Sequence, residues 1–435
     1  GIAASAARRG VTKNMARTTA KAAHGSSFWH MLAGGVMRHP WLTLIPLLAL
    51  LLVAGSPFLG LRLGWGGPAL LPEHAESRQG YELLRDDFAV GQNNEINVVV
   101  SYPDGAALDA ARIGQLYDYH RWLASVPGVG TVRSIFDLPG PDGKSLPKEA
   151  SIGMLTGPRE ALPQELQAAL HQTVGAHAVR LSVITPTDAD SDTARAVVRA
   201  IRDESAPRPG GEVLVGGETA FVLDVAASVK ADTPRSIAFV VIATYIVLFL
   251  LLGSVLLPLK AVLMNLLSIT ASYGALVWIF QDGHLSKFLD FTPASIDMTV
   301  PVMMFCLLFG LSMDYEVLLL SRMKEEWERT RDNAYAVAEG LEQTGRLITG
   351  AAAIMTFVFG AFALAELVTV KSIGVGMALA VAVDALVIRT LLVPASMRLL
   401  GNLNWWAPAP LARFQQRLSL GHGESLPAAR AQVGD

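Results

Sequence analysis

Cysteine is nearly absent from this sequence: Cys306 is the only one among 435 residues. One cysteine cannot build a disulfide framework or a cluster of cysteine metal ligands. Charged residues are also scarce, at 17% of the chain, whereas soluble domains carry roughly 25%. The sequence has no G-x-x-x-x-G-K-[ST] motif, so it lacks a P-loop of its own. These absences exclude a disulfide-stapled domain and a self-contained ATPase.

Hydrophobic residues make up 51% of the chain and gather in blocks. A helix needs about 20 apolar residues to cross a bilayer, and six blocks approach or exceed that length. The sequence therefore predicts an α-helical polytopic membrane protein with six transmembrane helices, at 42–61, 236–252, 261–280, 298–320, 346–365 and 372–394.

A polar insert separates the first span from the other five. Its alternating apolar runs predict strands, and its amphipathic stretches predict helices. The order strand, helix, strand occurs twice, which predicts an α+β, ferredoxin-like sandwich of two βαβ units. The expected strands are 94–102, 129–138, 177–186 and 211–217, and the expected helices are 107–126 and 191–205, the latter capped by Ser191 or Asp192.

Basic residues predict the orientation in the membrane. The first 40 residues carry no acid but several arginines and lysines, which by the positive-inside rule places them in the cytoplasm. The loop "SRMKEEWERTRD" and Lys260 then also face the cytoplasm, and the insert lies outside the cytoplasmic membrane. The predicted parts are 1–40 (cytoplasmic), 41–61 (span 1), 62–234 (extracytoplasmic insert), 235–400 (spans 2–6) and 401–435 (cytoplasmic tail).

One acid is expected deep within the fourth span, in "FGLSMDYEVLLLSRMKEE". Asp314 lies roughly 25 Å along the helix from the outer end of this span. Acids within membrane spans are costly, and they mark ion pathways and proton relays. We therefore expect Asp314, with Tyr315 beside it, to carry protons. The helical spacing predicts one inward-packing face made of Gly310, Asp314, Val317 and Ser321.

A second acid, Asp384, interrupts the last span. Because ionisable groups in membranes usually pair, we expect a structural ion pair among Asp384, Arg389 and Arg346, with direct proton relay as the alternative. Ser321 is a further supporting polar residue. Small residues allow transmembrane helices to approach closely, which predicts a packing role for Gly310, Gly350, Gly374 and Gly376.

Four stretches in this order, "FGLSMDYEVLLLSRMKEE", "GRLITGAAA", "DALVIRTLLVPASMRLLG" and "NWWAP", resemble the MmpL-type transporters of the resistance–nodulation–division superfamily. The resemblance covers residues 29 to 411 and is to the C-terminal half of such proteins. It implies proton-driven export of lipids or other hydrophobic molecules, with Asp314 and Tyr315 in the relay and the insert as a porter domain. No enzymatic activity, cofactor, metal or nucleic-acid partner is expected.

The resemblance also implies a missing partner, because the relay of that family couples one Asp–Tyr pair from each half. This chain has one such pair within the membrane, and it begins "GIAASAARRG" without an initiator methionine. We therefore expect a second six-helix unit, either an upstream half of the same protein or, as the alternative, a second copy in a homodimer.

Two other classes of protein share parts of this pattern. A SecD/SecF-like export accessory would have the same order of span, insert and five spans, but the "MDYE…SRMKEE" motif argues against it. An intramembrane aspartyl protease would need two acids such as Asp314 and Asp384. Its motifs fit poorly, because the fourth span has Asp-Tyr rather than Tyr-Asp, and Asp384 follows "AVAV" rather than Gly-x-Gly.

Overall fold

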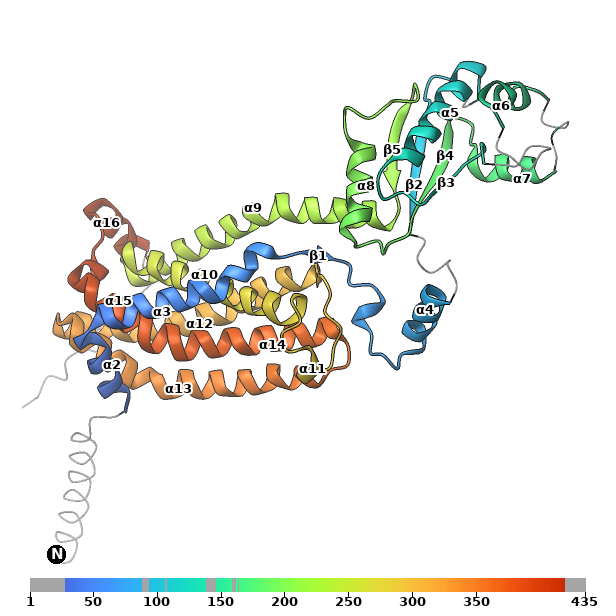
Figure 1. Cartoon of the computed structure of the whole chain (residues 1–435). Helices are drawn as coiled ribbons and strands as arrows, with labels where there is room; N and C mark the ends of the chain where they lie inside the picture. The colour runs from blue at the N-terminus through green and yellow to red at the C-terminus, as the bar shows by residue number, and fades with distance from the viewer. Residues whose placement is uncertain are drawn as a thin grey trace, which may run out of the picture.

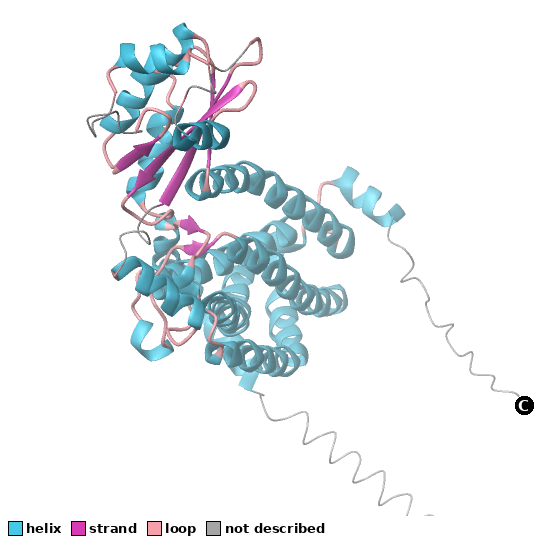
Figure 2. Ribbon diagram, turned by 90° about the vertical axis from the view of Figure 1, so that its right-hand side faces the viewer, coloured by secondary structure: helices cyan, strands magenta, loops and turns pink. Residues whose placement is uncertain are grey.

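The computed structural model describes residues 28–87, 94–105, 108–137, 146–158, 162 and 164–418. Figure 1 shows a long helical bundle with a small domain of helices and strands at one end. In Figure 2 the strands gather in that domain, except for a short pair beside the bundle. The expectations for residues 1–27 and 419–435 lie outside the described residues.

Six helical segments of the described chain are long and apolar enough to cross a membrane, and each overlaps a predicted block. Their elements are α3 (Pro40–Gly55) with η1 (Ser56–Gly60); α9 (Glu218–Leu252); α10 (Leu256–Leu276) with η4 (Val277–Gln281); α12 (Thr299–Thr330); α13 (Asn333–Ala361) with η5 (Phe362–Leu364); and α14 (Val368–Val383), η6 (Asp384–Leu392), α15 (Val393–Leu400) and η7 (Gly401–Trp405).

The helix α9 is longer than its apolar block. It begins at Glu218 and runs for 35 residues, so it crosses the predicted boundary between the insert and the second span without a break. The apolar pattern marks only the part suited to hydrocarbon and cannot detect a polar extension of the same helix. Pro234 lies inside it. One continuous rod thus connects the small domain to the bundle (Figure 1).

The helices α12 and α13 also extend beyond their apolar blocks at the end of the bundle away from the small domain. Opposite charges one turn apart support the polar end of α12, as between Arg322 and Glu325, whose side-chain atoms are 2.8 Å apart. The Asp332 carboxylate caps α13 by accepting from the backbone N–H groups of Ala334 and Tyr335. The chain therefore reverses direction within two residues between these helices.

The small domain contains a four-stranded antiparallel sheet in the order β3-β4-β2-β5. Each strand and both main helices lie within their predicted stretches, although β3 is only three residues long. Along the chain the elements are β2 (Asn94–Ser101), α5 (Ala110–Ser125), β3 (Thr131–Arg133), α6 (Lys148–Leu155), α7 (Gln164–Thr173), β4 (Ala178–Thr185), α8 (Asp192–Arg202) and β5 (Glu212–Gly216).

The central strand β2 organises the core of this domain. Its alternate residues Ile96, Val98 and Val100 are fully buried, as the period of two in a strand requires. The pairing of Val98 with Leu181 of β4 and Val215 of β5 fixes the register on both sides.

The apolar face of α8 packs against the sheet. Its N-cap is Ser191 rather than Asp192, because the Ser191 side chain accepts a hydrogen bond from the Ala194 backbone N–H.

Short elements tie the small domain to the bundle. The strand β1 (Leu63–Gly64) follows the first span and pairs in parallel with β6 (Ile296–Asp297), which precedes α12. Between β1 and the sheet lie η2 (Pro68–Leu70) and α4 (Glu76–Asp86). The short helix α11 (Ser286–Leu289) precedes β6, and its last carbonyl, that of Leu289, accepts a hydrogen bond from the Lys371 ammonium. Lys371 is a buried residue of α14.

Two helices at the ends of the described chain lie at the opposite end of the bundle (Figure 1). These are α2 (Phe28–Arg38) and α16 (Ala409–Leu418). In α2, the backbone N–H of His30 donates to the Glu342 carboxylate of α13 at 3.2 Å. Both described ends thus lie on the same side of the spans, as an even number of crossings requires.

The orientation predicted from charge can be tested by cysteine labelling in a Cys306→Ala background. Ala150, on α6, is exposed, so Ala150→Cys should react with an impermeant maleimide in intact cells. Arg331→Cys, in the exposed turn after α12, should react only after permeabilisation.

Ser151 provides the matched control, because it is 2% exposed although it is the next residue. Ser151→Cys should react slowly in either condition. If Arg331→Cys but not Ala150→Cys reacted in intact cells, the orientation would be the opposite of the predicted one.

Candidate functional site

The polar residues of "SMDYE" on α12 point in different directions. Ser312 and Glu316 are buried at 9% and 5% exposure, and they lie four residues apart on one face of the helix. Asp314 is exposed on another face of the helix. Tyr315 is half-buried, and it lies between the buried face and the face of Asp314. Successive residues of an α-helix are about 100° apart, so one short stretch supplies polar groups to both the inside and the outside of the bundle.

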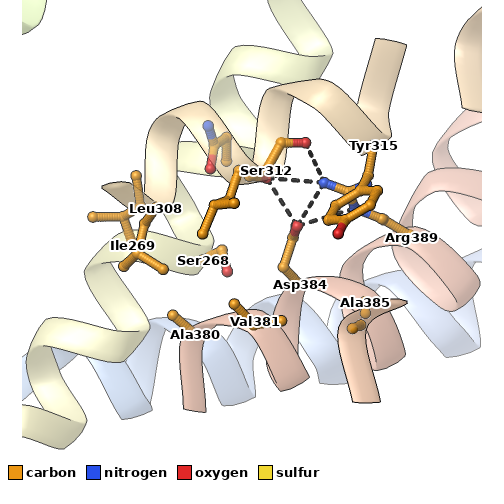
Figure 3. Close-up of a pocket in the computed structure, with 13 residues that line it drawn as sticks. Ser268, Ile269, Leu308, Ser312, Tyr315, Ala380, Val381, Asp384, Ala385 and Arg389 are labelled. Carbon is orange, nitrogen blue, oxygen red and sulfur yellow. Dashed lines mark hydrogen bonds and ion pairs between the residues drawn. The ribbon is translucent and has the colours of Figure 1, made fainter. Parts of the chain in front are cut away.

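An ion pair holds the inner side of this stretch (Figure 3). Arg389, only 1% exposed, donates from Nε and Nη2 to Asp384 Oδ2 at 3.0 and 2.7 Å. The Ser312 hydroxyl donates to the same carboxylate oxygen at 2.8 Å, and Arg389 Nη2 also donates to the Ser312 carbonyl. The sixth span is thereby joined to α12 through hydrogen-bonded charges. Removing one partner of such a buried pair typically costs about 3–5 kcal/mol.

A π-helical segment makes this pair possible. Residues five apart point in widely different directions on an α-helix, but Asp384 and Arg389 lie in η6, a π-helix. The i→i+5 hydrogen bonding of a π-helix widens the turn, which brings the two side chains together. Such segments occur frequently at functional sites. The structure therefore brings Asp384 and Arg389 together, as expected, by a geometry that a 3.6-residue period does not predict.

Arg346 and Ser321 do not join this pair. Arg346 is exposed on α13, and the Asp384 carboxylate is bonded instead by Ser312 and Arg389. Ser321 is half-buried two turns beyond Asp314, and the described contacts of the pair do not include it. The expectation that Arg346 takes part is wrong, because its side chain leaves α13 on a face that other helices do not cover.

Tyr315 lies against the ion pair. The Arg389 guanidinium carbon is 5.3 Å from the centre of the Tyr315 ring, within the range of a cation–π interaction. Both residues line a cavity of about 20 Å³ with Asn265, Ser312 and Asp384, which is enough room for one water molecule. The ring therefore separates the buried charges from the exposed side of α12.

Three further polar residues belong to this region and were not predicted from the sequence. Lys260, Asn265 and Glu316 are 8%, 3% and 5% exposed. Within the described residues, Lys260 Nζ, Glu316 Oε1, Arg389 Nη1 and both amide atoms of Asn265 have no hydrogen-bond partner. Lys260 was expected in a cytoplasmic loop but lies buried in α10. The i, i+4 spacing of Ser312 and Glu316 could have indicated this polar face.

Asp314 lies on the opposite side of α12, on a surface that no other helix of the described chain covers. We call this surface the open face; it consists of Met303, Cys306, Leu307, Gly310 and Asp314, all exposed. A Cβ atom added to Gly310 would meet nothing within 4 Å. The prediction that Gly310 and Asp314 pack inward is therefore wrong for this chain. Helical spacing shows which residues share a face, but not which neighbour that face meets.

Two of the four glycines predicted to pack against other helices do so in this chain, and the other two do not. A Cβ atom on Gly374 would lie 2.3 Å from the Phe362 Cβ, and one on Gly376 would lie 2.6 Å from the Met304 methyl carbon. These two glycines allow close helix contacts, as expected. Gly350, like Gly310, is exposed with nothing within 4 Å of an added Cβ atom, so neither packs against a helix of this chain.

Metal binding has no support in the described part of the chain. No three His, Cys, Asp or Glu side chains gather there in a way that could hold a metal ion. The ionisable groups of the site are Asp314 on the open face, and Asp384, Arg389, Glu316 and Lys260 inside.

Six apolar helices, an inserted α+β domain and charges buried between the helices define a multi-pass membrane protein built around an ionisable core. Residues 69–419 match the MMPL family. The chain belongs to this family of transporters, within the resistance–nodulation–division superfamily.

Several mycobacterial proteins are similar over most of this chain. The trehalose monomycolate exporter MmpL3 of Mycobacterium tuberculosis is 33% identical over 93% of the chain and 40% of its own length. The mycolic acid-containing lipids exporter MmpL11 of Mycolicibacterium smegmatis is 33% identical over 88% of the chain and 37% of its own length. The heme uptake protein MmpL11 of M. tuberculosis is 34% identical over 95% and 39%, respectively. The chain thus spans about two fifths of the length of these relatives.

The buried ion pair predicts how single and double substitutions affect stability. Asp384→Asn and Arg389→Met should each lower the free energy of unfolding by about 3–5 kcal/mol, because each leaves one buried charge unpaired. The double variant should lose less than the sum of the two. Arg346→Gln, on an exposed face, should change it by less than about 0.5 kcal/mol. Unfolding of the four purified variants by heat or denaturant measures these changes. If the two single variants unfolded at the same temperature as the wild type, the ion pair would not stabilise the protein.

Proposed function

We propose that this chain is one half of a proton-driven exporter of lipids or other hydrophobic molecules, with Asp314 and Tyr315 in the proton relay. The observation that carries the proposal is the open face. Asp314 lies near the middle of α12, a 32-residue helix, on a surface that the rest of the described chain leaves uncovered. A charged carboxylate there would face hydrocarbon, at a cost of several kcal/mol. A second helical unit that covers Asp314 removes this cost and places the acid between two units.

Protonation of Asp314 then becomes a switch at the contact between the two units. The ionised acid requires a polar or charged partner across the contact, whereas the neutral acid can pack against apolar groups. Gaining or losing a proton therefore changes which arrangement of the two units is more stable. The Tyr315 hydroxyl can donate a hydrogen bond to the ionised Asp314 or accept one from the neutral acid. The cation–π contact with Arg389 holds the ring in place.

The small domain is proposed to be a ferredoxin-like, extracytoplasmic porter domain. Its sheet order β3-β4-β2-β5 and its two strand–helix–strand units support that fold. The continuous helix α9 supports the porter role, because a rod that enters both the domain and the bundle transmits movement from one to the other. Proton-driven movement of the spans would in this way open or close a path through the domain.

The proposed substrate class rests on the relatives. Two of them are named as exporters of lipids that carry mycolic acids, and one as a heme uptake protein. All three names describe transport of large, partly apolar molecules. The proposed cargo of this chain is therefore a lipid or another hydrophobic molecule leaving the cytoplasmic membrane.

The two alternative classes have less support from the geometry. An aspartyl protease needs two carboxyl groups that share one site, but Asp314 faces outward while Asp384 is bonded inside to Arg389. A SecD/SecF-like accessory would share the order of the spans, but the similar proteins are named as transporters of lipids or heme.

Asp314→Asn should reduce proton-gradient-driven lipid export from vesicles to background while leaving the melting temperature unchanged. The amide keeps the size of the side chain but cannot carry the proton, and the residue contacts little within its own chain. Tyr315→Phe should reduce export strongly but not completely.

Two aspartates serve as controls for this experiment. Asp384→Asn should lower both export and stability, because its carboxylate holds the ion pair. Asp118→Asn, on the exposed side of α5, where the carboxylate pairs with the Lys148 ammonium at 2.5 Å, should leave export unchanged and cost less than about 1 kcal/mol of stability. Export by Asp314→Asn at the wild-type rate would remove Asp314 from the relay.

The native Cys306 can identify the second unit. It is exposed on the open face, two helical turns and ~12 Å from Asp314. If an upstream half covers this face, a short bismaleimide should join Cys306 to a cysteine placed on the matching helix of that half. The chain expressed alone should then give few cross-linked dimers and no export.

A homodimer would behave in the opposite way: the chain alone would cross-link through Cys306 and export at full rate. The matched control is Leu308→Cys in a Cys306→Ser background. Leu308 is on the same helix but 5% exposed, so this variant should not cross-link in either case.

A further inference from the structure

The last helix of the described chain, α16, lies at the edge of the bundle, where it contacts the end of α9. The Gln415 side chain donates from Nε2 to the Leu250 carbonyl of α9 at 3.0 Å. Figure 1 shows α16 at the end of the bundle away from the small domain, and in Figure 2 it lies to the side of the spans rather than among them. The proposed proton relay does not use this helix.

The contact with α16 helps to complete the end of α9. The last carbonyl groups of a helix have no hydrogen-bond partners within the helix itself. In α9, the backbone N–H of the C-cap Gly253 and the ammonium of Lys324 each bond to one of them, and Gln415 bonds to a third. Just before α16, the Trp406 carbonyl accepts from the Val255 N–H at 3.2 Å. The position of α16 is therefore tied to the corner between α9 and α10.

The two sides of α16 differ in polarity. Leu411 and Phe414 are three residues apart and share one side of the helix, where they are 42% and 54% exposed. Arg413 is exposed on a different side, because successive residues of an α-helix are about 100° apart. Gln415, four residues after Leu411, borders the apolar side and reaches α9. The helix is therefore amphipathic, and the described chain leaves much of its apolar side uncovered.

Three observations favour the surface of the lipid bilayer as the partner of this apolar side. Residues 401–418 contain two arginines and no acid, and basic amphipathic helices bind to membrane surfaces. Trp406, which precedes the helix, is 52% exposed, and tryptophans are enriched where a membrane meets water. The neighbouring turns of α9 expose Val247 and Leu251, at 61% and 43%. An apolar surface thus continues from a membrane span to α16.

We propose that α16 is an interfacial helix that binds the bilayer surface at this end of the spans, with Leu411 and Phe414 inserted among the lipids and Arg413 facing the headgroups. Such helices bury their apolar side roughly 5–10 Å into the boundary between headgroups and acyl chains. The membrane thereby holds Gln415 against α9 and fixes the end of that helix. The inference goes beyond the proposed function, because it requires neither a proton gradient nor a second unit.

Fluorescence quenching tests the contact between α16 and lipid directly. Leu411→Cys, Phe414→Cys and the control Arg413→Cys are each made in the full 435-residue chain with Cys306→Ala, and each thiol carries the fluorophore NBD. The labelled chains are placed in nanodiscs of phosphatidylcholine and phosphatidylglycerol. Phosphatidylcholine spin-labelled near its headgroup should quench the labels on Leu411→Cys and Phe414→Cys roughly twofold or more than that on Arg413→Cys, because only the apolar side enters the bilayer. Soluble iodide should quench the three labels in the reverse order.

Phe414→Glu provides a second test, which is measured with the label on Leu411→Cys. A carboxylate on the apolar side opposes insertion, so quenching by the spin-labelled lipid should fall to the level seen for Arg413→Cys. Phe414→Leu, the matched control that stays apolar, should keep the quenching of the parent. If Phe414→Glu lowers the melting temperature, the comparison of the three labels decides.

Two results would overturn the proposal. Equal quenching of all three labels by iodide, with equally weak quenching by the spin-labelled lipid, would place α16 in water. Protection of the labels on Leu411→Cys and Phe414→Cys from both quenchers would show that protein, such as a second copy of the chain, covers the apolar side. Neither result would affect the Asp314→Asn export experiment, so failure of this contact and failure of the proposed relay are distinguishable.

Discussion

The buried ion pair between Asp384 and Arg389 is the interaction on which the arrangement of the spans depends. Burying two charges costs several kcal/mol each unless they pair and their remaining hydrogen bonds are satisfied. Pairing requires the π-helical segment η6, because an α-helix would direct residues five apart away from each other. It also involves Ser312, whose hydroxyl and carbonyl add hydrogen bonds to the pair, although Arg389 Nη1 has no hydrogen-bond partner among the described residues. These contacts fix the rotation of α12 relative to the sixth span.

The fixed rotation of α12 determines where Asp314 lies. Once Ser312 and Glu316 face the ion pair, Asp314 must face the other way, and Tyr315 lies between the two sides. The unit therefore holds an ion pair on its inner side, whereas the Asp314 carboxylate on its outer side has no ion pair with another described residue. This asymmetry is the physical reason to propose a partner, and the similarity to longer relatives is independent support for it.

The sequence was sufficient to predict the elements but not their mutual orientation. Apolar length gave all six spans, and alternation gave the four strands of the sheet, because both patterns are local. The direction of Asp314 was predicted wrongly. Helical periodicity shows which residues share a face, but it does not show which other helix, if any, packs against that face. Lys260 was placed in a loop because a lysine at the edge of an apolar block usually lies in water. The ion pair in the π-helical segment is bonded to Ser312, 77 residues from Arg389, and local sequence carries little signal for such a distant contact.

The helix α9 also connects the polar end of α12 with the small domain. The Lys324 ammonium of α12 donates to the Leu251 carbonyl near the end of α9, at 3.0 Å. The same helix begins at Glu218, two residues after the end of β5, a strand of the small domain. Pro234 removes one backbone hydrogen bond between these points, and prolines inside helices are where helices bend. A shift of α12 would therefore move one end of α9 and, through a bend at Pro234, the small domain at its other end.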